Sequence, residues 1–569
     1  MSKAKRTDSQ VLQNKLLKES EMANEKEAPK RVSRKDFVKG AALGAGALAG
    51  AGALASCAPA ATPAPTAAPE ATASAVPAAA ATPAPEKWDK EVDVVVVGAG
   101  TALLGAVAAA SAGATVLVLE KAPVVGGSTA LSGGVIYAAE TSVQRAAGVE
   151  DSKDTMYEDW MRATFNEADP ELVRLIADRA AEVIEWFVEH GVDFPTDPNF
   201  LYQSGPDPVR RGHTVEGRIG EPYTTVLESV AKEKGAEILL EHRAGQLLTD
   251  STGRVVGVPA TDAEGTALTI HAKKAVILGT GGFGKDEDML REYYPLSAKD
   301  IWFGAPENTG DGIRAAQTLW ADTTGLHHFT EGLGVSLLMV GGTERGLVGL
   351  KLLNAVVAGF PPTFKHEPSS YIVVNKAGDR FVSDVEFYVV ILTEVYKQEG
   401  AMCHLIFDES MKSDERFTLG IAWTRDELMS AIDEKWVKSA DTVEELASEL
   451  EIDPVRLRET VDKYNGYVAA GQDPEFGRDA VTLKALDTPP FYGILHRPGF
   501  CMHGGGLRVN TKMQVLRRDR AVIPGLYAIG NDIGGMFTMG YPGSGSALAS
   551  GFVGALVAGE NAAAETPQA

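Results

Sequence analysis

The stretch Val92-Asp93-Val94-Val95-Val96-Val97-Gly98-Ala99-Gly100 decides the fold of this 569-residue chain. Its run of valines predicts a buried β-strand, because a strand covered on both faces has a nearly continuous apolar sequence. Gly98 and Gly100 let the backbone approach a phosphate group, and the Ala-rich helix predicted next points its N-terminus at that phosphate. The stretch therefore predicts the first half of a βαβ dinucleotide-binding unit.

The second half of this unit follows directly. Thr115–Leu119 is predicted to form the next strand, which ends at Glu120. In dinucleotide-binding folds an acidic residue about 20 positions after the first glycine accepts hydrogen bonds from the ribose, and Glu120 has that place. Leu103 occupies the third glycine position, with Gly105 two residues later. Since that glycine normally eases the packing of helix on strand, we expect a rearranged helix contact and an intact phosphate loop.

Glycine-rich segments recur further along the chain, at residues 120–134, 275–283, 309–312 and 525–531. In this order they resemble the segments of the fumarate reductase / 3-ketosteroid dehydrogenase flavoprotein superfamily. The resemblance implies an α/β fold, in which a Rossmann-like FAD-binding domain is interrupted by an α+β substrate-capping domain. It also implies that FAD is the cofactor and that it is bound non-covalently.

The resemblance assigns the FAD contacts residue by residue to Gly98, Gly100, Glu120, Lys121, Gly127, Ser128, Thr129, Gly133, Gly134, Thr280, Gly281, Gly282, Asp311, Asn531 and Ser546. It divides the FAD-binding domain into a first part at residues 88–318 and a second part at 488–569. The capping domain occupies residues 319–487, where Tyr371–Asn375 and Gly378–Phe381 resemble the cap signature of the superfamily.

Two arginines of the fumarate-type members have no counterpart here. Those enzymes carry an arginine acid just after the cap signature and a late arginine that binds the substrate carboxylate. Tyr388 stands at the first of these positions, and Tyr541-Pro542-Gly543 resembles the turn of the ketosteroid dehydrogenase branch. The sequence therefore favours a neutral carbonyl substrate over a dicarboxylate.

Four side chains are candidates for catalysis. We predict that Tyr388 carries the substrate proton and that Tyr541 donates a hydrogen bond to the carbonyl, with Tyr492 and His503 as further candidates. A tyrosine near pKa 10 needs an environment that lowers this value before it acts as a base. Each of the four is alternatively a packing residue, and His213 is a weaker candidate still.

The predicted activity is the reduction, or the introduction, of a C=C bond next to a carbonyl by hydride transfer at flavin N5. An enoate reductase of the fumarate, urocanate or cinnamate type is the alternative. A flavin-carrying electron-transfer or binding lipoprotein is the alternative of another class, but such a carrier has no need of a cap. The direction of the reaction and the identity of the small-molecule substrate stay open.

Cysteine usage argues against other redox centres. The chain holds only Cys57, Cys403 and Cys501, with no CxxCH and no four-cysteine motif. We therefore expect no covalent haem, no iron–sulfur cluster and no metal site. Cys403 and Cys501 are either two separate thiols, which we favour, or a disulfide in an oxidising compartment.

The first 87 residues indicate export. Residues 1–40 hold eleven basic and six acidic residues, whereas the whole chain has a net charge of -23. Ser33–Lys39 and the uncharged run after it resemble a twin-arginine signal, with Lys35 in place of the second arginine. Leu54-Ala55-Ser56-Cys57 resembles a lipobox, so residues 1–57 are interpreted as an export signal with a lipobox. Cleavage without a lipid is the alternative.

Residues 58–87 are rich in Ala, Pro and Thr and predict a semi-rigid linker. We thus expect a lipoprotein on the outer face of the cytoplasmic membrane, attached by its lipid alone. There NAD(P)H is a poor donor, so a separate electron-transfer protein or quinone-linked donor is expected, as in anaerobic respiration. The acidic charge argues against a nucleic acid partner.

The lipobox interpretation predicts the behaviour of one variant. Cys57→Ala removes the thiol that would carry the lipid, so the protein should move from the membrane fraction to the soluble fraction. Fractionation followed by immunoblotting measures this. A variant that stays in the membrane fraction, with its signal segment shown to be cleaved, contradicts the interpretation.

Overall fold

The computed structural model describes residues 82–196, 201–203, 209–215, 219–295, 300–302, 304–326, 337–338, 368–386, 388–414, 425–435, 437–500, 502–537 and 540–568. All of them belong to the second of two compact units, Pro77–Ala569. The predicted export signal with Cys57, most of the predicted linker, and Cys501 lie outside the described residues. Cys403 is a free, buried thiol.

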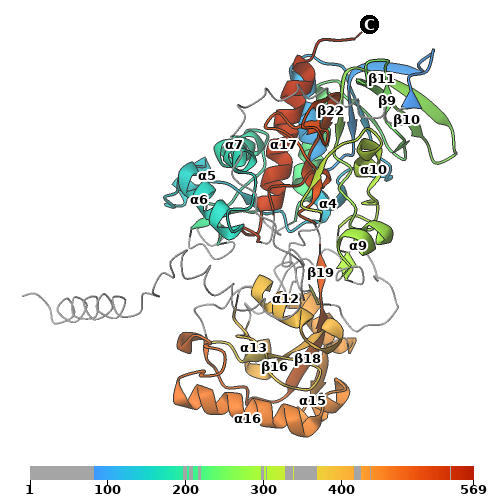
Figure 1. The fold of residues 1–569 in the computed structure, drawn as a ribbon. Helices are drawn as coiled ribbons and strands as arrows, with labels where there is room; N and C mark the ends of the chain where they lie inside the picture. The colour runs from blue at the N-terminus through green and yellow to red at the C-terminus, as the bar shows by residue number, and fades with distance from the viewer. Residues whose placement is uncertain are drawn as a thin grey trace, which may run out of the picture. The chain divides into compact units, whose positions relative to one another are not determined.

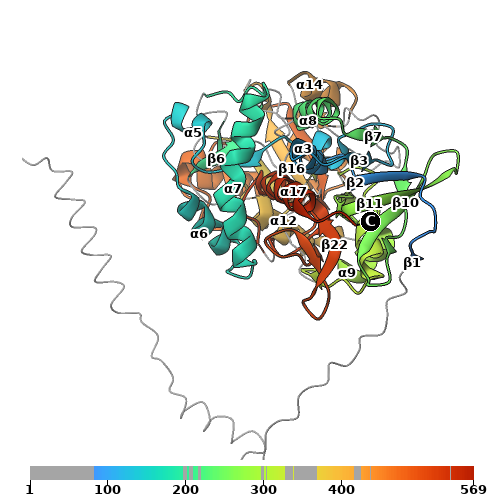
Figure 2. The ribbon, with the colours of Figure 1, turned by 90° about the horizontal axis from the view of Figure 1, so that it is seen from above.

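Five parallel strands form the centre of the larger sheet, which is seen in Figure 1 and has all five strands labelled in Figure 2. Their order is β22 (Val522–Ala528), β11 (Ala267–Leu278), β2 (Lys90–Val97), β3 (Val116–Leu119) and β7 (Glu237–Leu239). The predicted βαβ unit is present as β2, helix α3 (Ala102–Ser111) and β3. The first four of these strands, β22, β11, β2 and β3, are each followed by one of the glycine-rich or acidic segments, so these segments meet at the carboxyl edge of the sheet.

Antiparallel strands extend this sheet. The first half of β11 pairs with β10 (Val255–Thr261), and β10 pairs in turn with β8 (Arg243–Ala244) and β9 (Leu248–Thr249). β1 (Thr82–Pro83) is parallel to β9, and β21 (Gln514–Leu516) is antiparallel to β22. The other helices and strands of this part are α4 (Gly127–Leu131), β4 (Ile136–Tyr137), α5 (Ser142–Ala146), α6 (Lys153–Ala163), α7 (Pro170–Glu189), β5 (Tyr202–Gln203), β6 (Arg210–His213), α8 (Glu221–Glu233), α9 (Glu287–Tyr293), β12 (Ile301–Trp302), α10 (Asp311–Gln317), β13 (Thr323–Thr324), β19 (Gly499–Phe500), β20 (Gly506–Leu507) and α17 (Ser546–Ala564).

Helix α17 lies beside α3 and α7 in the core of this part (Figure 2). Of the described helices, it alone is long and apolar enough to cross a membrane, and 67% of that apolar stretch is buried inside the protein. A buried core helix has the same composition as a membrane span. Its apolar character is therefore explained by its neighbours.

The contact expected to be rearranged around Leu103 is a helix–helix contact. Leu103 is fully buried. A Cβ atom at Gly105 would lie 2.9 Å from the Ala555 carbonyl oxygen, and one at Gly559 would lie 2.3 Å from the Gly105 carbonyl oxygen. Gly105 and Gly559 thus let the backbones of α3 and α17 touch, and no third fingerprint glycine is needed at position 103.

The smaller sheet is antiparallel and has the order β14 (Leu337–Leu338), β18 (Phe491–Arg497), β16 (Cys403–Asp408), β15 (Tyr371–Val374), with β17 (Lys438–Ala440) on β18. One face carries Leu405 and Phe407 and packs against α12 (Tyr388–Tyr396) and α14 (Arg425–Asp433). The other face carries Ile406 and packs against α15 (Val443–Glu449) and α16 (Pro454–Ala470). The predicted domain boundaries stay predictions. β18 belongs to the predicted second part of the FAD-binding domain, residues 488–569, but pairs in this smaller sheet.

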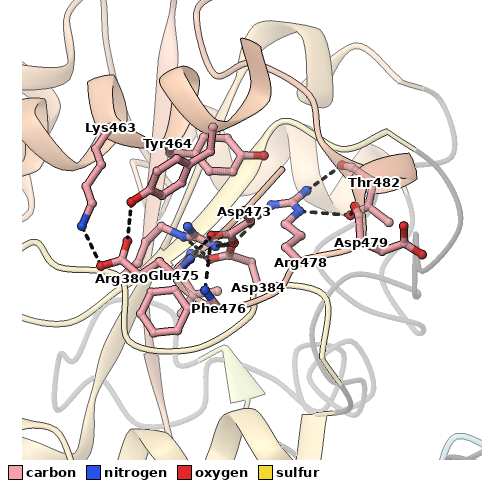
Figure 3. Close-up of polar contacts among 12 residues, drawn as sticks. Arg380, Asp384, Lys463, Tyr464, Asp473, Glu475, Phe476, Arg478, Asp479 and Thr482 are labelled. Carbon is pink, nitrogen blue, oxygen red and sulfur yellow. Dashed lines mark hydrogen bonds and ion pairs between the residues drawn. The ribbon is translucent and has the colours of Figure 1, made fainter. Parts of the chain in front are cut away.

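A buried ion cluster lies beside β15 (Figure 3). Arg380 donates to Asp384 at 2.6 Å and to Asp473 at 2.7 Å. Its Cζ atom lies over the rings of Tyr464 and Phe476, 5.1 Å from each ring centroid. The side chains of all three ions are at most 2% exposed. Because an unpaired buried charge is strongly destabilising, such a cluster is expected to hold together as a unit.

Arg478 joins this cluster to the sheet. Its guanidinium donates to the carbonyls of Ser369, Tyr371 and Thr482 at 2.6–2.9 Å. Asp384 in turn accepts the Val373 N–H at 2.6 Å. The segment that leads into α12 is therefore fixed to β15 by buried hydrogen bonds, and this was not evident from the cap signature alone.

The α3–α17 contact predicts a difference between two helical glycines. Gly559→Ala should lower the free energy of unfolding by about 1–3 kcal/mol, because overpacking forces the helix backbones apart. Gly466→Ala on the exposed face of α16, where nothing lies within 4 Å, should raise it by up to about 1 kcal/mol. Thermal unfolding of both variants checks this, and equal midpoints would argue against the close contact.

Candidate active site

The loop after β2 touches the loop after β11. Gly98 has a φ of +105°, and a Cβ atom there would lie 2.1 Å from the Gly279 carbonyl oxygen. Glycine alone adopts this positive φ without strain, and it has no Cβ atom that would overlap the carbonyl oxygen. Gly100 is also close to a neighbour, since its Cβ would lie 3.0 Å from Thr129 Oγ1. These glycines let three loops share one surface.

Glu120 is held at this surface by backbone donors. Its two carboxylate oxygens accept the N–H groups of Ala99 and Ala122, each at 2.8 Å. Burial raises the pKa of Glu120, and the two backbone hydrogen bonds oppose the rise. A carboxylate has about four lone-pair positions, so two stay available for ribose hydroxyls. The geometry fits the ribose contact predicted from the sequence.

The loop at 126–134 is tied to the turn after β11. Ser128 Oγ accepts hydrogen bonds from Ala305 N–H and Asn308 Nδ2, both at 2.8 Å. The same Asn308 amide donates to the Gly281 carbonyl at 2.8 Å. Gly127 has nothing within 4 Å of its Cβ position. The predicted residues Ser128 and Gly281 are thus brought together by Asn308, which the sequence analysis missed.

The remaining members of this loop have defined surroundings. Thr129 is buried against Gly100, and the Gly134 carbonyl accepts the Tyr223 hydroxyl at 2.7 Å. Gly133 beside it is half-buried. The backbone of the loop is therefore held on one side by Tyr223.

Lys121 and Asp311 pair across 190 positions of sequence. Lys121 Nζ donates to Thr309 Oγ1 at 2.8 Å and to Asp311 Oδ2 at 2.9 Å, while Arg243 donates to the other Asp311 oxygen at 2.8 Å. Burial acts to raise the pKa of Asp311, but the hydrogen bonds from Lys121 and Arg243 lower it overall. The Lys121 ammonium is therefore neutralised by Asp311.

Asp532 is a site residue that the sequence analysis missed. Its fully buried carboxylate accepts Thr280 N–H at 2.6 Å, Thr280 Oγ1 at 2.8 Å and Gly282 N–H at 2.9 Å. It therefore fixes the turn after β11 from the end of β22. The sequence pointed to its neighbour Asn531, which is half-buried, and the only signal for Asp532 was an acid inside an apolar, glycine-rich segment.

His503 has both ring nitrogens bonded to backbone. Nε2 accepts Phe283 N–H at 2.9 Å, Nδ1–H donates to the Gly505 carbonyl at 2.8 Å, and the ring lies 3.8 Å from that of Phe283. Burial lowers the pKa of His503 to about 4, against the opposing Gly505 hydrogen bond. The neutral, doubly bonded ring favours positioning of the Gly282 turn over proton transfer. The catalytic role stays a prediction.

The three predicted tyrosines lie in different elements. Tyr492 is in β18 of the smaller sheet, stacks on Phe407, and donates to Glu409 at 2.6 Å; burial and this hydrogen bond raise its pKa. These contacts favour packing. Tyr541 is half-buried in the turn before α17, with its ring 5.8 Å from Phe537. Tyr388 is the first residue of α12, and its side chain lies outside the described residues.

Two more predicted residues have structural contacts. Ser546 begins α17 and its hydroxyl donates to the Gly543 carbonyl at 2.7 Å, which closes the Tyr541 turn. His213 is fully buried, accepts the Thr141 hydroxyl at 2.7 Å, and has its pKa lowered by burial to about 4. No group of His, Cys, Asp and Glu suited to a metal ion occurs among the described residues.

Arg211 forms a second buried ion cluster. Its guanidinium donates to both Asp151 oxygens at 2.7 and 2.8 Å, to Asp159 at 2.7 Å and to the Tyr137 hydroxyl at 3.0 Å. The side chains of Arg211 and Asp151 are fully buried. This arginine is committed to two carboxylates.

Comparison with known proteins agrees with this geometry. Residues 93–548 match the family model described as FAD binding domain. The chain is 32% identical over 491 residues to a urocanate reductase of Eggerthella lenta, covering 84% of this chain and 76% of that protein.

Solved structures agree as well. A flavocytochrome c3 fumarate reductase in an open conformation superposes with a TM-score of 0.68 at 29% identity, covering 84% of this chain and 78% of the other. A 3-ketosteroid-Δ4-(5α)-dehydrogenase of Rhodococcus jostii, solved with 4-androstene-3,17-dione, gives a TM-score of 0.64 at 27% identity, covering 85% and 99%. The predicted superfamily, the α/β fold class and FAD as the cofactor are confirmed.

The site predicts how FAD is held. Because the loops offer backbone N–H groups and a ribose-binding carboxylate, purified protein should be yellow with about one FAD per chain, bound without a covalent link. Acid or heat should release the flavin, as measured by absorbance of the supernatant and chromatography. Release of FMN alone, or a flavin that stays on the precipitated chain, would show this account to be wrong.

Proposed function

Because this chain belongs to the FAD binding domain family and is a FAD-dependent oxidoreductase that acts on C=C bonds, we propose that it reduces a C=C bond conjugated to a neutral carbonyl. Bound FAD supplies the hydride at the carbon β to the carbonyl. The chain supplies the proton at the α carbon and a hydrogen-bond donor for the negative charge that develops on the carbonyl oxygen.

The proposal of a neutral substrate rests on the fact that cations of the FAD-binding part are already paired with carboxylates. Lys121 is paired with Asp311, Arg211 with Asp151 and Asp159, and Arg508 with Asp322 at 2.8 Å. Each of these three cations lies in the FAD-binding part and is already paired with at least one carboxylate. A substrate carboxylate buried there needs an uncommitted cation, because an unpaired buried charge is costly. A ketone or similar carbonyl needs only a neutral donor.

Tyr541 is the proposed donor to the carbonyl, and Tyr388 is the proposed proton carrier. Support for Tyr388 comes from the backbone: Asp384, four residues earlier, is fixed to Arg380, Arg478 and Val373 (Figure 3). Asp384, in the described segment that ends at Glu386 just before α12, is therefore held in place. A positioned general acid benefits from such rigidity, since small displacements reduce proton transfer strongly.

An enoate reductase is the second candidate. The likeness to the Eggerthella lenta urocanate reductase favours it. In that case the substrate would bring a carboxylate, and the paired cations above would have to exchange partners to bind it.

We further propose that the enzyme is exported, attached by lipid at Cys57, and reduced by a separate protein or quinone-linked donor. The signal and lipobox patterns support export. The position outside the cytoplasm supports a donor other than NAD(P)H. Reduction is then the favoured direction, as in anaerobic respiration.

A substrate screen tests the proposed function. The protein is reduced by dithionite without oxygen and mixed with cyclic enones, 3-ketosteroids, or enoates such as urocanate and cinnamate. Reoxidation of the flavin by enones or ketosteroids, followed at its absorbance maximum, is the expected result. Reoxidation by enoates alone would establish the second candidate, and no reoxidation by any conjugated acceptor would count against both.

Tyr388→Phe separates chemistry from packing, because the ring is kept and only the hydroxyl is lost. Loss of a general acid typically costs about 10²–10⁴ in rate, so turnover should fall by that factor with normal FAD content. Tyr467→Phe on α16 is the control. The Tyr467 hydroxyl is exposed, and its hydrogen bond to Glu475 is long at 3.5 Å, so its loss should have little effect. Near-full turnover of Tyr388→Phe on the best acceptor would remove this residue as proton carrier.

A further inference from the structure

The turn that carries Tyr541 is held by a distant part of the chain. Asp169 N–H donates to the Gly535 carbonyl at 2.7 Å, and Tyr137 N–H donates to the Gly545 carbonyl at 3.2 Å. Between these points, a Cβ atom at Gly540 would lie 1.8 Å from the Ala163 carbonyl oxygen. The part of the chain from β4 to the start of α7, residues 137–169, therefore contacts the turn at both ends and near its middle.

Trp160 makes the side-chain contact between them. It is fully buried in α6, and its indole Nε1–H donates to the Met536 carbonyl at 2.9 Å. The indole also stacks on Phe537, with the ring centroids 5.5 Å apart and an interplanar angle of 26°. Phe537 in turn lies 5.8 Å from the ring of Tyr541. A continuous path of contacts thus runs from the indole to the Tyr541 phenol.

The indole is itself fixed by the Arg211 cluster. Tyr137 packs edge-on against Trp160 with centroids 6.1 Å apart, and its hydroxyl accepts from Arg211 at 3.0 Å. Asp159, the residue before Trp160, pairs with the same guanidinium at 2.7 Å. The buried charges therefore set the place of both the ring and its backbone.

The turn needs such an anchor because of its composition. Glycine occupies positions 534, 535, 540, 543 and 545, and glycine has more backbone freedom to lose than any other residue. A hydroxyl that must meet a carbonyl oxygen tolerates little displacement: about 1 Å of misplacement can cost up to about 10²-fold in rate. Without a fixed support, the phenol would sample many positions.

We propose that Trp160 is a positioning residue for catalysis, which fixes the Tyr541 phenol through the Met536 carbonyl and the Phe537 ring. This inference rests on the proposed role of Tyr541 as donor to the substrate carbonyl. Trp160 acts through the turn and does not itself touch the substrate.

The test removes only the indole donor. Trp160→Phe keeps an aromatic ring but leaves the Met536 carbonyl without its N–H. Hydrogen exchange of the amides in residues 535–545 should become at least about 10-fold faster, while exchange in β2 and β11 and the FAD content stay unchanged. This measurement does not depend on any substrate. Phe537→Leu, which removes the stacked ring, should have the same local effect if Trp160→Phe does not fold.

A control variant separates positioning from general stability. Asn465→Ala also removes a donor to a backbone carbonyl, that of Leu486 at 3.0 Å, but beside the smaller sheet and outside both ion clusters. It should lower the unfolding midpoint without changing turnover or exchange in the turn. Trp160→Phe should instead lower kcat by about 10-fold, with a smaller effect on KM.

A double-mutant cycle identifies the group through which Trp160 acts. In a Tyr541→Phe background the hydroxyl is absent, so Trp160→Phe should cause little further loss of kcat, whereas independent sites would give multiplied losses. Unchanged exchange in residues 535–545 would overturn the positioning role, and so would fully multiplied losses. If exchange is faster in Trp160→Phe but Tyr541→Phe is fully active, then Trp160 does hold the turn, and the role of Tyr541 as donor to the carbonyl is refuted.

Discussion

The close approach of Gly98 to the Gly279 carbonyl is the constraint on which the rest of the site depends. It joins the loops after β2 and β11, and a Cβ atom would stand 2.1 Å from that oxygen. Once these loops touch, Glu120 can bind the backbone of the first and Asp532 the backbone of the second. The parallel order of the strands brings all these groups to one edge.

Buried charge in this protein is matched locally. Glu120 and Asp532 are held by backbone N–H groups, whereas Arg211 and Arg380 are each held by two aspartates. A buried ion without a partner would be strongly destabilising, so these sets specify where their chain segments lie. On the proposal of a neutral carbonyl substrate, the catalytic work falls to neutral hydroxyl groups.

The two proposed catalytic tyrosines are prepared in different ways. Tyr388 begins a helix whose preceding segment is fixed by the Arg380 and Arg478 cluster (Figure 3). Tyr541 lies in a glycine-rich turn, which is held from outside by Trp160. In both cases a buried ion cluster lies behind the segment that carries the hydroxyl. The buried charges thus fix chain segments next to the two proposed catalytic tyrosines.

The sequence by itself determined the βαβ unit, the glycine loops, FAD as the cofactor, the superfamily and the α/β fold class. The βαβ unit and the glycine loops follow from local patterns: a run of valines at 94–97, glycines directly after strands, and an acid about 20 residues on. The superfamily, its fold class and FAD follow from the resemblance of these segments, in their order, to a known flavoprotein superfamily. Local spacing depends on backbone conformation, so it predicts the loops but not the distant residues that contact them.

Only the tertiary structure decided which side chains support those loops. Asp532 meets Thr280 across 252 residues, Lys121 meets Asp311 across 190, and Trp160 meets Met536 across 376. No periodicity encodes such pairs, because they depend on which buried donors and acceptors the packed core brings into contact. The same reason explains why the sequence held no sign of the Asp532 contacts, and why it could not show that the ring of the candidate His503 is bound to backbone.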